Sequence, residues 1–377
     1  MKTKAWFHAA FGISVGLLTS VTAISGEPLG LVLSGGGAKG AYETGVWKAL
    51  NEAELARNVV AISGTSIGAI NAALFSCIGK TGEVERIWLD EVDGILSVNE
   101  DYLLRFGTPE EREREAAIMK SNIAADIAAE AKRRKTEVDK LPPEIIRTIE
   151  TKCQSVSAKK LLIRHGNQAL WNSLRGVLKD GCSDGLLDSG KLFSVLTKNL
   201  PTFWPSTAPT AYATALEKLE GGVYSLTLFR LNDGENGSRI SEICASAAIP
   251  VGFDTVSIDG KNYVDGGWEA KGGNNVPLGP ILERHPEIKT AIVVYLADEK
   301  HLNRDRFEKN RAAATAAGVR LVEIVPSADI GGAFGWAGVF DASPETAKHL
   351  IELGRSDARK VLKAAEMENH PTAKGKY

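Results

Sequence analysis

The chain has 377 residues, of which 44% are hydrophobic and 24% charged, as in an ordinary globular protein. This length suits one large α/β domain with an insertion, or two domains. The formal net charge of −2 gives no electrostatic reason to expect a nucleic acid as partner.

The N-terminus has the pattern of a secretory signal peptide. Lys2 and Lys4 precede an apolar stretch over residues 5–21, and small side chains follow it. Because no basic flank follows the apolar run, cleavage is favoured, and we expect export to the periplasm or beyond the cell. The alternative is an uncleaved membrane anchor, since the run is only slightly shorter than the roughly 20 residues of a spanning helix.

Beyond the N-terminus, apolar runs bounded by glycine alternate with helical patterns, which is typical of a parallel sheet covered by helices on both faces. A late helix is expected to begin at Ser343, as N-cap, and Pro344, at the first helical position. The predicted fold is a three-layer α/β/α sandwich with a mainly parallel central sheet. The expected strands cover residues 29–33, 59–63, 290–296 and 319–325, and the expected helices cover residues 40–50, 67–75 and 303–317.

Between the two sheet-forming regions, we expect a helical insertion that acts as a cap or lid. It contains a capping box, in which Thr108 and Glu111 bracket Pro109 at the first helical position. The helix that follows ends in a basic cluster, residues 132–135, which we interpret as a solvated helix end rather than a lipid-headgroup site. The expected organisation is a signal peptide over residues 1–25, an α/β domain over 26–97 and 183–365, the insertion over 98–182 and a flexible tail over 366–377.

The pairing of the four cysteines stays open. Because an exported chain can form disulfides, Cys153 and Cys182, which bracket one segment of the insertion, are the favoured pair. Cys77 and Cys244 lie beside predicted core elements and suit buried thiols equally well. No pair has the close spacing of a zinc site, so no metal site is predicted.

A glycine-rich turn, Ser-Gly-Gly-Gly-Ala-Lys-Gly at residues 34–40, follows the first strand and opens a helix. It fits the dinucleotide-binding pattern, but the second strand has no carboxylate near its end to bind a ribose. It fails the P-loop pattern, because Gly40 and not a hydroxyl residue follows Lys39. The remaining interpretation is a set of backbone N–H groups at a helix N-terminus that can bind a developing oxyanion.

A second turn, Gly-Thr-Ser-Ile-Gly at residues 64–68, lies between the second strand and the next helix. In a G-x-S-x-G turn the glycines relieve clashes, and the serine projects from the carboxyl end of the strand. The pattern also occurs by chance in loops, so it is the strand–helix context that favours Ser66 as a nucleophile.

The identity of the base that would activate Ser66 distinguishes a Ser-His-Asp triad from a Ser-Asp dyad. A Ser-His-Asp triad needs a histidine after the serine, and none there has a strong local signature. Asp265, in contrast, ends an apolar run and precedes two glycines, although an Asp-Gly-Gly turn is ordinary by itself. A carboxylate beside a serine hydroxyl can take its proton on attack and return it to the leaving alkoxide. The histidines after the serine are His165, His285, His301, His349 and His370.

In this order, the motifs resemble those of the patatin-like phospholipase family. The matching segments are residues 35–40, 64–68, 245–250 (Ala-Ser-Ala-Ala-Ile-Pro) and 265–267 (Asp-Gly-Gly). The resemblance covers about residues 29–96 and 185–362, which makes the α/β domain the catalytic one. This chain departs from compact family members in its longer helical insertion and in residues 268–273, which delay the Asn-x-Pro stretch.

The resemblance implies hydrolysis of lipid acyl esters through a Ser-Asp dyad and an acyl-enzyme, without a metal or another cofactor. Its implied partners are a lipid or phospholipid substrate and, transiently, a membrane surface; a protein activator stays open, and no nucleic acid is expected. Two other functions stay open: a Ser-His-Asp triad esterase, and a catalytically silent protein that binds lipid or a partner. The implied site comprises the catalytic Ser66 and Asp265, the oxyanion residues Gly35, Gly36, Gly37 and Lys39, and the motif glycines Gly40, Gly64, Gly68, Gly266 and Gly267.

Overall fold

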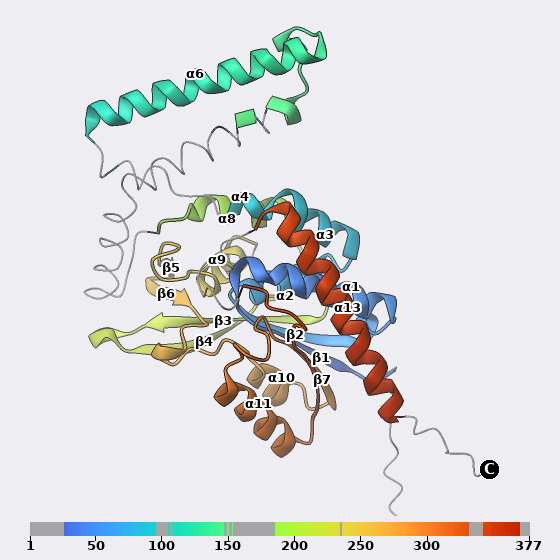
Figure 1. Cartoon of the computed structure of the whole chain (residues 1–377). Helices are drawn as coiled ribbons and strands as arrows, with labels where there is room; N and C mark the ends of the chain where they lie inside the picture. Colours follow the sequence, from blue (N-terminus) through green and yellow to red (C-terminus); the bar gives the residue numbers. More distant parts are fainter. Residues whose placement is uncertain are drawn as a thin grey trace, which may run out of the picture.

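An eight-stranded sheet forms the centre of the computed structural model of this chain (Figure 1). The expected signal peptide lies outside the described residues, as does the chain after residue 369. The structure describes residues 26–95, 105, 108–146, 149, 150, 153, 185–233, 236–331 and 342–369. The strands are β1 (Leu29–Leu33), β2 (Val59–Thr65), β3 (Thr210–Lys218), β4 (Tyr224–Arg230), β5 (Val256–Ile258), β6 (Lys261–Asp265), β7 (Thr290–Val294) and β8 (Arg320–Ile324).

Parallel pairing runs through the middle of the sheet. β2 and β7 flank β1, β3 lies beyond β2, and β8 lies beyond β7, all in parallel register. The remaining strands are antiparallel: β4 and β6 both pair with β3, and β5 pairs with β6. The prediction of a mainly parallel sheet is therefore confirmed, whereas β3, β4, β5 and β6 were not predicted.

The helices after the parallel strands lie where the sequence predicts them. Ser343 Oγ accepts the Thr346 N–H at 3.4 Å, as expected of an N-cap. The last helix continues to Asn369, past residue 366, where the tail was expected to begin, and its buried side chains include Leu362 and Ala365. Among the described residues, no helix combines the length and apolar character that a bilayer-spanning segment needs. These helices are α1 (Ala41–Glu52), α2 (Ile67–Cys77), α11 (Arg304–Ala317) and α13 (Pro344–Asn369).

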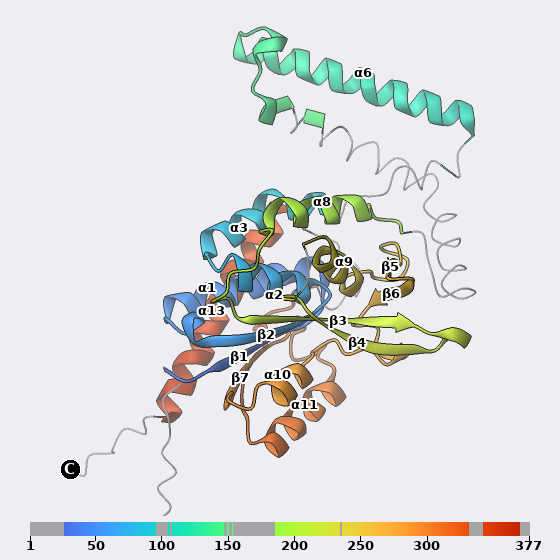
Figure 2. The ribbon, with the colours of Figure 1, turned by 180° about the vertical axis from the view of Figure 1, so that it is seen from behind.

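Helices cover both faces of the sheet (Figures 1 and 2), which confirms the three-layer sandwich. Alternate side chains of β1 divide the core between the faces. Leu31 and its neighbours two residues away pack with α1, α2 and α13, whereas Val32 packs on the opposite face with α10 (Gly279–Arg284) and α11. The first face also carries α3 (Thr81–Asp90), α4 (Val92–Ile95), α8 (Ser189–Asn199) and α9 (Asn236–Ser246).

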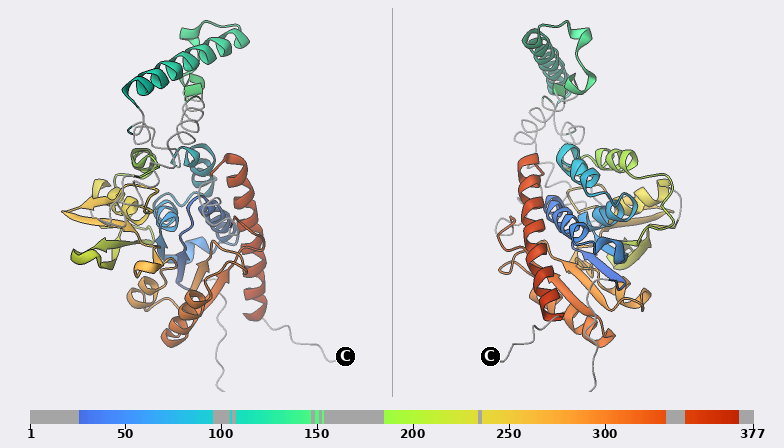
Figure 3. Two further views of the ribbon diagram at one scale, coloured as in Figure 1. Left: turned by 60° about the vertical axis from the view of Figure 1, so that its left-hand side comes forward. Right: turned by 90° about the vertical axis from the view of Figure 1, so that its right-hand side faces the viewer.

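The insertion contributes one long described helix, α6 (Pro109–Arg134), which lies outside the three layers (Figure 3). The predicted capping box is present: Thr108 Oγ1 accepts the Glu111 N–H at 3.2 Å, and Glu111 Oε2 accepts the Thr108 N–H at 3.0 Å. In the basic cluster, Arg133 and Arg134 both pair with Glu130 at 2.7 Å, which favours a solvated helix end over a headgroup site.

The proposed disulfide is not tested, because Cys182 lies outside the described residues. Cys77 and Cys244 are free thiols beside the core, as one of the two alternatives expected. Burial raises the pKa of each thiol to about 12, so both stay protonated at neutral pH.

The contact between α1 and α13 gives a testable prediction about stability. A Cβ added to Gly45 would lie 2.0 Å from the Ile351 carbonyl oxygen and 2.7 Å from the Arg355 nitrogen. Because backbone atoms of a packed helix cannot move aside, we expect Gly45→Ala to lower the free energy of unfolding by about 1–3 kcal/mol in urea titrations. Gly82→Ala is the matched control, since a Cβ there meets nothing within 4 Å. Equal stability of the two variants would contradict this packing.

Candidate active site

A pocket of about 640 Å³ opens where β1, β2 and β6 end. Ser66 and Asp265, which are 199 positions apart in the chain, both line it, together with residues 35–37 of the glycine-rich turn. Apolar side chains, among them Ile249 and Leu296, form part of its wall. The volume and the mixture of apolar walls with a few polar groups are typical of a small-molecule site.

Ser66 occupies the sharp turn that the sequence predicts between β2 and α2. Its backbone has φ 57° and ψ −124°, a conformation that non-glycine residues rarely adopt. A Cβ on Gly64 would lie 2.1 Å from the Gly68 carbonyl oxygen, and a Cβ on Gly68 would lie 2.4 Å from the Leu33 carbonyl oxygen. The two glycines therefore permit α2 to begin directly against the end of β1.

Ser246, from the segment 245–250, joins the serine turn to the end of β6. Its Oγ accepts the Ser66 N–H at 2.9 Å and donates to the Thr214 carbonyl oxygen at 2.6 Å. Its own carbonyl oxygen accepts the Gly266 N–H at 3.4 Å. The segment 245–250 was predicted as a motif, but no local pattern indicated these contacts of Ser246, because its partners lie far away in the sequence.

The glycine-rich turn lies beside Ser66, with one change to the expected use of its amides. The Gly35 N–H donates to the Asn275 carbonyl oxygen at 3.0 Å, and Asn275 Nδ2 donates to the Gly35 carbonyl oxygen at 3.2 Å. The Gly35 amide is thus already satisfied and is not available to an oxyanion, contrary to expectation. Within the described residues, the Gly36 and Gly37 N–H groups donate no hydrogen bond. The delayed Asn-x-Pro stretch nevertheless reaches the turn and supports it.

A buried polar network behind the turn connects α1 with α2. Asn71 Nδ2 donates to the Gly40 carbonyl oxygen at 2.9 Å and to Glu43 Oε2 at 2.8 Å. Trp88 Nε1 donates to Asn71 Oδ1 at 3.0 Å. Burial raises the pKa of Glu43 well above its usual range, which favours the protonated form of this carboxyl. No local pattern indicated this buried carboxyl, because an acidic residue in the first turn of a helix is ordinarily solvated.

Asp265 lies at the end of β6 with only 6% of its surface exposed. Its N–H donates to the Ala248 carbonyl oxygen at 2.9 Å, and its Oδ1 accepts the Gly267 N–H at 2.6 Å. Burial raises the pKa of Asp265 to about 6, against the opposite effect of the nearby Ser66 hydroxyl and the Gly267 N–H. Oδ2 is buried and makes no hydrogen bond of standard geometry within the described residues. One oxygen of this buried carboxyl is therefore free to take a proton.

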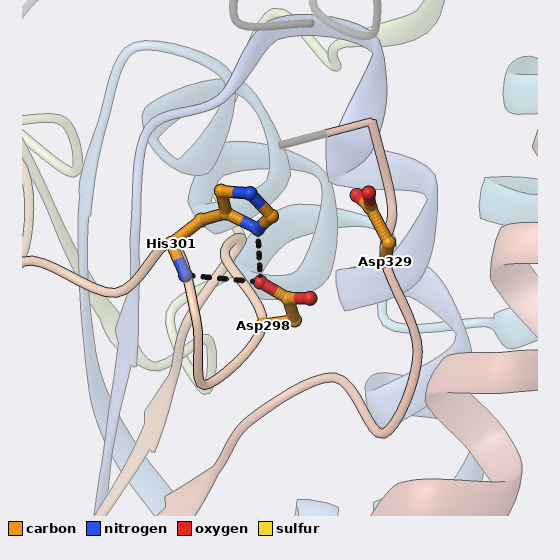
Figure 4. A group of neighbouring side chains, drawn as sticks. All are labelled: Asp298, His301 and Asp329. Carbon is orange, nitrogen blue, oxygen red and sulfur yellow. Dashed lines mark hydrogen bonds and ion pairs between the residues drawn. The ribbon is translucent and has the colours of Figure 1, made fainter. Parts of the chain in front are cut away.

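Lys39 lies along the other side of the glycine-rich turn, largely buried. Burial lowers the pKa of Lys39, whereas the negative charges of Asp329 and Asp298 raise it. Asp298, His301 and Asp329 lie side by side (Figure 4), with potential ligand atoms within 4.8 Å of one another. Because the lysine ammonium already lies in the field of both carboxylates, we interpret this group as the electrostatic partner of Lys39 rather than as a metal site.

The described histidines differ in their relation to the pocket. His301 lines it, and its Nδ1 lies 2.5 Å from Asp298 Oδ1. His285 is held elsewhere, between the Tyr212 hydroxyl at 3.0 Å and Glu287 at 2.9 Å. His349 lies on α13 and does not line the pocket, and the candidates at positions 165 and 370 lie outside the described residues.

Comparison with known proteins agrees with the motifs. The family model for patatin-like phospholipases matches residues 31–281. Lysophospholipase nte1 from Aspergillus terreus is 51% identical over 53 residues, which make up 14% of this chain and only 3% of that protein. The solved structure of VipD from Legionella pneumophila aligns at 18% identity with a TM-score of 0.42, over 90% of this chain and 67% of that one. Human GIVD cytosolic phospholipase A2 aligns at 10% identity with a TM-score of 0.42, over 91% of this chain and 61% of that one.

Burial of Asp265 predicts that stability depends on pH. Its pKa is about 6 in the folded protein against an ordinary 3.8, so the folded state holds the proton more tightly than the unfolded state. The free energy of unfolding should therefore fall as pH rises from about 4 to 6 and stay low above. We expect Asp265→Asn to be more stable than wild type by up to roughly 2–3 kcal/mol at pH 7.5 and little different at pH 4, measured by urea unfolding.

The exposed Asp233 provides the matched control, because its side chain is 65% exposed. Asp233→Asn should change stability little at either pH. If Asp265→Asn raised the free energy of unfolding equally at pH 4 and pH 7.5, the buried charge would not be the cause of the stabilisation.

Proposed function

Because the chain belongs to the patatin-like phospholipase family, we propose that it hydrolyses acyl esters of lipids with Ser66 as nucleophile and Asp265 as base. The observation that carries this proposal is that one pocket holds a serine on a strained turn, a buried carboxyl with a free oxygen, and a glycine-rich turn with unpaired amides. The chain covers only 3% of the length of the lysophospholipase that it matches, so the proposal rests on this site.

The proposed reaction has two displacement steps. Ser66 Oγ attacks the ester carbonyl carbon while Asp265 takes the hydroxyl proton, and the Gly36 and Gly37 N–H groups stabilise the oxyanion. The bond to the alcohol then breaks, and Asp265 returns the proton to the leaving alkoxide. Water next attacks the acyl-enzyme and gives a proton to Asp265, which passes it to Ser66 as the fatty acid leaves.

The environments of Asp265 and Lys39 support these roles. A carboxyl whose pKa is about 6 is a stronger base than an ordinary aspartate, yet it is still mostly ionised at neutral pH. Lys39 places a positive charge beside the turn that would carry the oxyanion. The apolar part of the pocket wall, which includes Ile249, Pro250 and Leu296, suits an acyl chain.

A Ser-His-Asp triad is the second candidate, favoured by one observation. His301 lines the same pocket, and Asp298 lies 2.5 Å from its Nδ1, as an orienting carboxylate would. We rank the dyad first because Asp265 shares with Ser66 the support of Ser246, whereas His301 lies beside Lys39 and its carboxylates.

From the sequence alone, we further propose where the protein is located and what it contacts. The basic residues and apolar run at the N-terminus support export, with residues 1–25 removed as a signal peptide or kept as an anchor. A lipid substrate supports transient contact with a membrane surface, and the helical insertion is the segment through which an activator would act. If the site were inactive, lipid or partner binding would be the remaining function.

The first test is fatty-acid release from mixed phospholipid vesicles in the presence of a chelator. We expect release by wild type and a loss of at least roughly 10³-fold in Ser66→Ala and Asp265→Ala, because both side chains take part in the same proton transfer. Thermal unfolding of each variant checks that the fold is intact. Full activity of either folded variant would rule out the Ser-Asp dyad mechanism. If wild type did not hydrolyse a soluble short-chain ester either, a binding function without catalysis would be favoured.

His301→Ala is the control that separates the two bases. The dyad mechanism predicts that this variant keeps most of its activity, whereas the triad predicts a loss as large as that of Ser66→Ala. Activity that survives Asp265→Ala and disappears in His301→Ala would assign the reaction to the triad.

The dyad also predicts how the rate depends on pH. Asp265 accepts a proton only when it is ionised, so kcat/KM for a soluble ester should fall about tenfold per pH unit below about 6 and level off above. The same profile in His301→Ala would assign this limb to the carboxyl. A profile that is flat between pH 4.5 and 8 would contradict Asp265 as the base.

A further inference from the structure

The hairpin formed by β3 and β4 exposes large apolar side chains near its tip. Leu219 is 42% exposed, Val223 58% and Leu226 43%, all within eight consecutive positions. The two strands are joined by the short 3₁₀ turn η4 (Glu220–Gly222), closed by a hydrogen bond from the Leu219 N–H to the Val223 carbonyl oxygen at 2.8 Å. Three such side chains within eight positions, at a tight and well-defined turn, differ from single apolar residues scattered over a surface.

The tip lies beyond the serine on the side where the pocket opens. β2 ends at Thr65, opposite Thr214 of β3, and Ser66 turns away into α2. β3 continues for four more residues, to Lys218, which carries the hairpin about 13 Å past the level of the serine. Figures 1 and 3 show the hairpin projecting from the body, on the side away from α13.

An aromatic pair connects the tip to the rim of the pocket. The ring of Tyr224, the first residue of β4, meets the ring of Trp268 edge to face, with centroids 5.5 Å apart. Trp268 itself lines the pocket. The ammonium of the exposed Lys271 lies 5.7 Å and 5.8 Å from the two ring centroids. From the end of the hairpin to the pocket, the apolar tip is therefore followed by the aromatic pair, with Lys271 beside both rings.

This order of side chains matches the layers of a membrane surface. Tyrosine and tryptophan favour the zone between headgroups and acyl chains, and lysine favours the headgroup phosphates. Short apolar side chains on a turn can enter the boundary between lipid headgroups and acyl chains. The exposed Glu220 beside them keeps the hairpin from inserting more deeply into the bilayer. A protein partner would not require the patch to join the pocket rim, whereas an aggregated lipid substrate would.

We propose that the tip of the β3–β4 hairpin, with Tyr224, Trp268 and Lys271, is the surface by which this protein docks on the lipid bilayer that holds its substrate. This inference rests on the proposed lipid hydrolase function and specifies its partner surface. Docking there sets the mouth of the pocket against the bilayer, so that an acyl ester moves from the membrane to Ser66 without crossing bulk water.

The test uses the double variant Leu219→Ser/Val223→Ser, which removes two exposed apolar side chains and no pocket residue. In a Ser66→Ala background, which prevents hydrolysis, we expect the partition coefficient on phosphatidylcholine–phosphatidylglycerol vesicles to fall about tenfold in sedimentation assays. With Ser66 present, hydrolysis of the vesicle lipid should fall by a similar factor, while hydrolysis of p-nitrophenyl butyrate in solution stays unchanged. Unchanged turnover of the soluble ester also shows that the variant is folded.

Phe203→Ser is the matched control. Phe203 is the most exposed large apolar residue described, at 84%. It precedes the amino end of β3, whereas the hairpin tip follows the carboxyl end of this strand. Its loss should leave vesicle binding unchanged. Vesicle binding that the double variant retains, or that Phe203→Ser loses equally, would overturn the proposal.

Two further outcomes separate this proposal from its alternatives. A concentration-dependent dimer of wild type, seen by analytical ultracentrifugation and abolished in Leu219→Ser/Val223→Ser, would make the tip an interface between copies of the chain and overturn membrane docking. No turnover of p-nitrophenyl butyrate by wild type would count against the hydrolase itself. The vesicle-binding comparison would then still decide whether the hairpin is the docking surface.

Discussion

The whole site depends on one close approach, between the first turn of α2 and the carboxyl end of β1. Gly68 lies so near this end that a Cβ there would sit 2.4 Å from the Leu33 carbonyl oxygen and 2.8 Å from that of Ser34. Only glycine permits this contact, and the contact holds the serine turn beside the glycine-rich turn that follows β1. A Cβ on Gly35 would lie 3.1 Å from the Ser66 Cβ, so the proposed nucleophile lies beside the glycine-rich turn because the two backbone segments are in contact.

Around this contact, the protein buries ionisable groups in environments that disfavour their charge. Burial raises the pKa of Glu43 behind the glycine-rich turn, raises the pKa of Asp265 to about 6, and lowers the pKa of Lys39. These groups have different duties in the proposed mechanism. Glu43, bonded to Asn71, links α1 to α2. Asp265 would take up and return a proton, and Lys39 would help to stabilise an anion. Preorganised polar groups in a water-poor site act more strongly than the same groups in water.

The features that were predicted correctly depend on interactions between residues close together in the sequence. The apolar run of β1, the glycines around Ser66 and the capping box at Thr108 act over a few residues, and each was found where the sequence placed it. Interactions across long chain separations were missed. Ser246 bonds to Ser66 across 180 positions, and Asn275 to Gly35 across 240, so neither carries a periodic signal. The Gly35 amide was assigned to an oxyanion because its partner could not be seen from the sequence.

β3, one of the strands that sequence patterns did not predict, explains how the proposed nucleophile and base meet. β2 runs along one edge of β3 and ends with Thr65 opposite Thr214; β6 runs in the opposite direction along the same edge and ends with Asp265 opposite Ala215. Two strands thus meet end to end at adjacent positions of a third, one followed by Ser66 and the other ending in the carboxyl. A Ser-Asp pair can arise in this way without any shared local motif, and the family resemblance identified it where patterns alone could not. Because β3 continues past this meeting point with β4 along its other edge, the same strand also carries the exposed hairpin to the rim of the pocket.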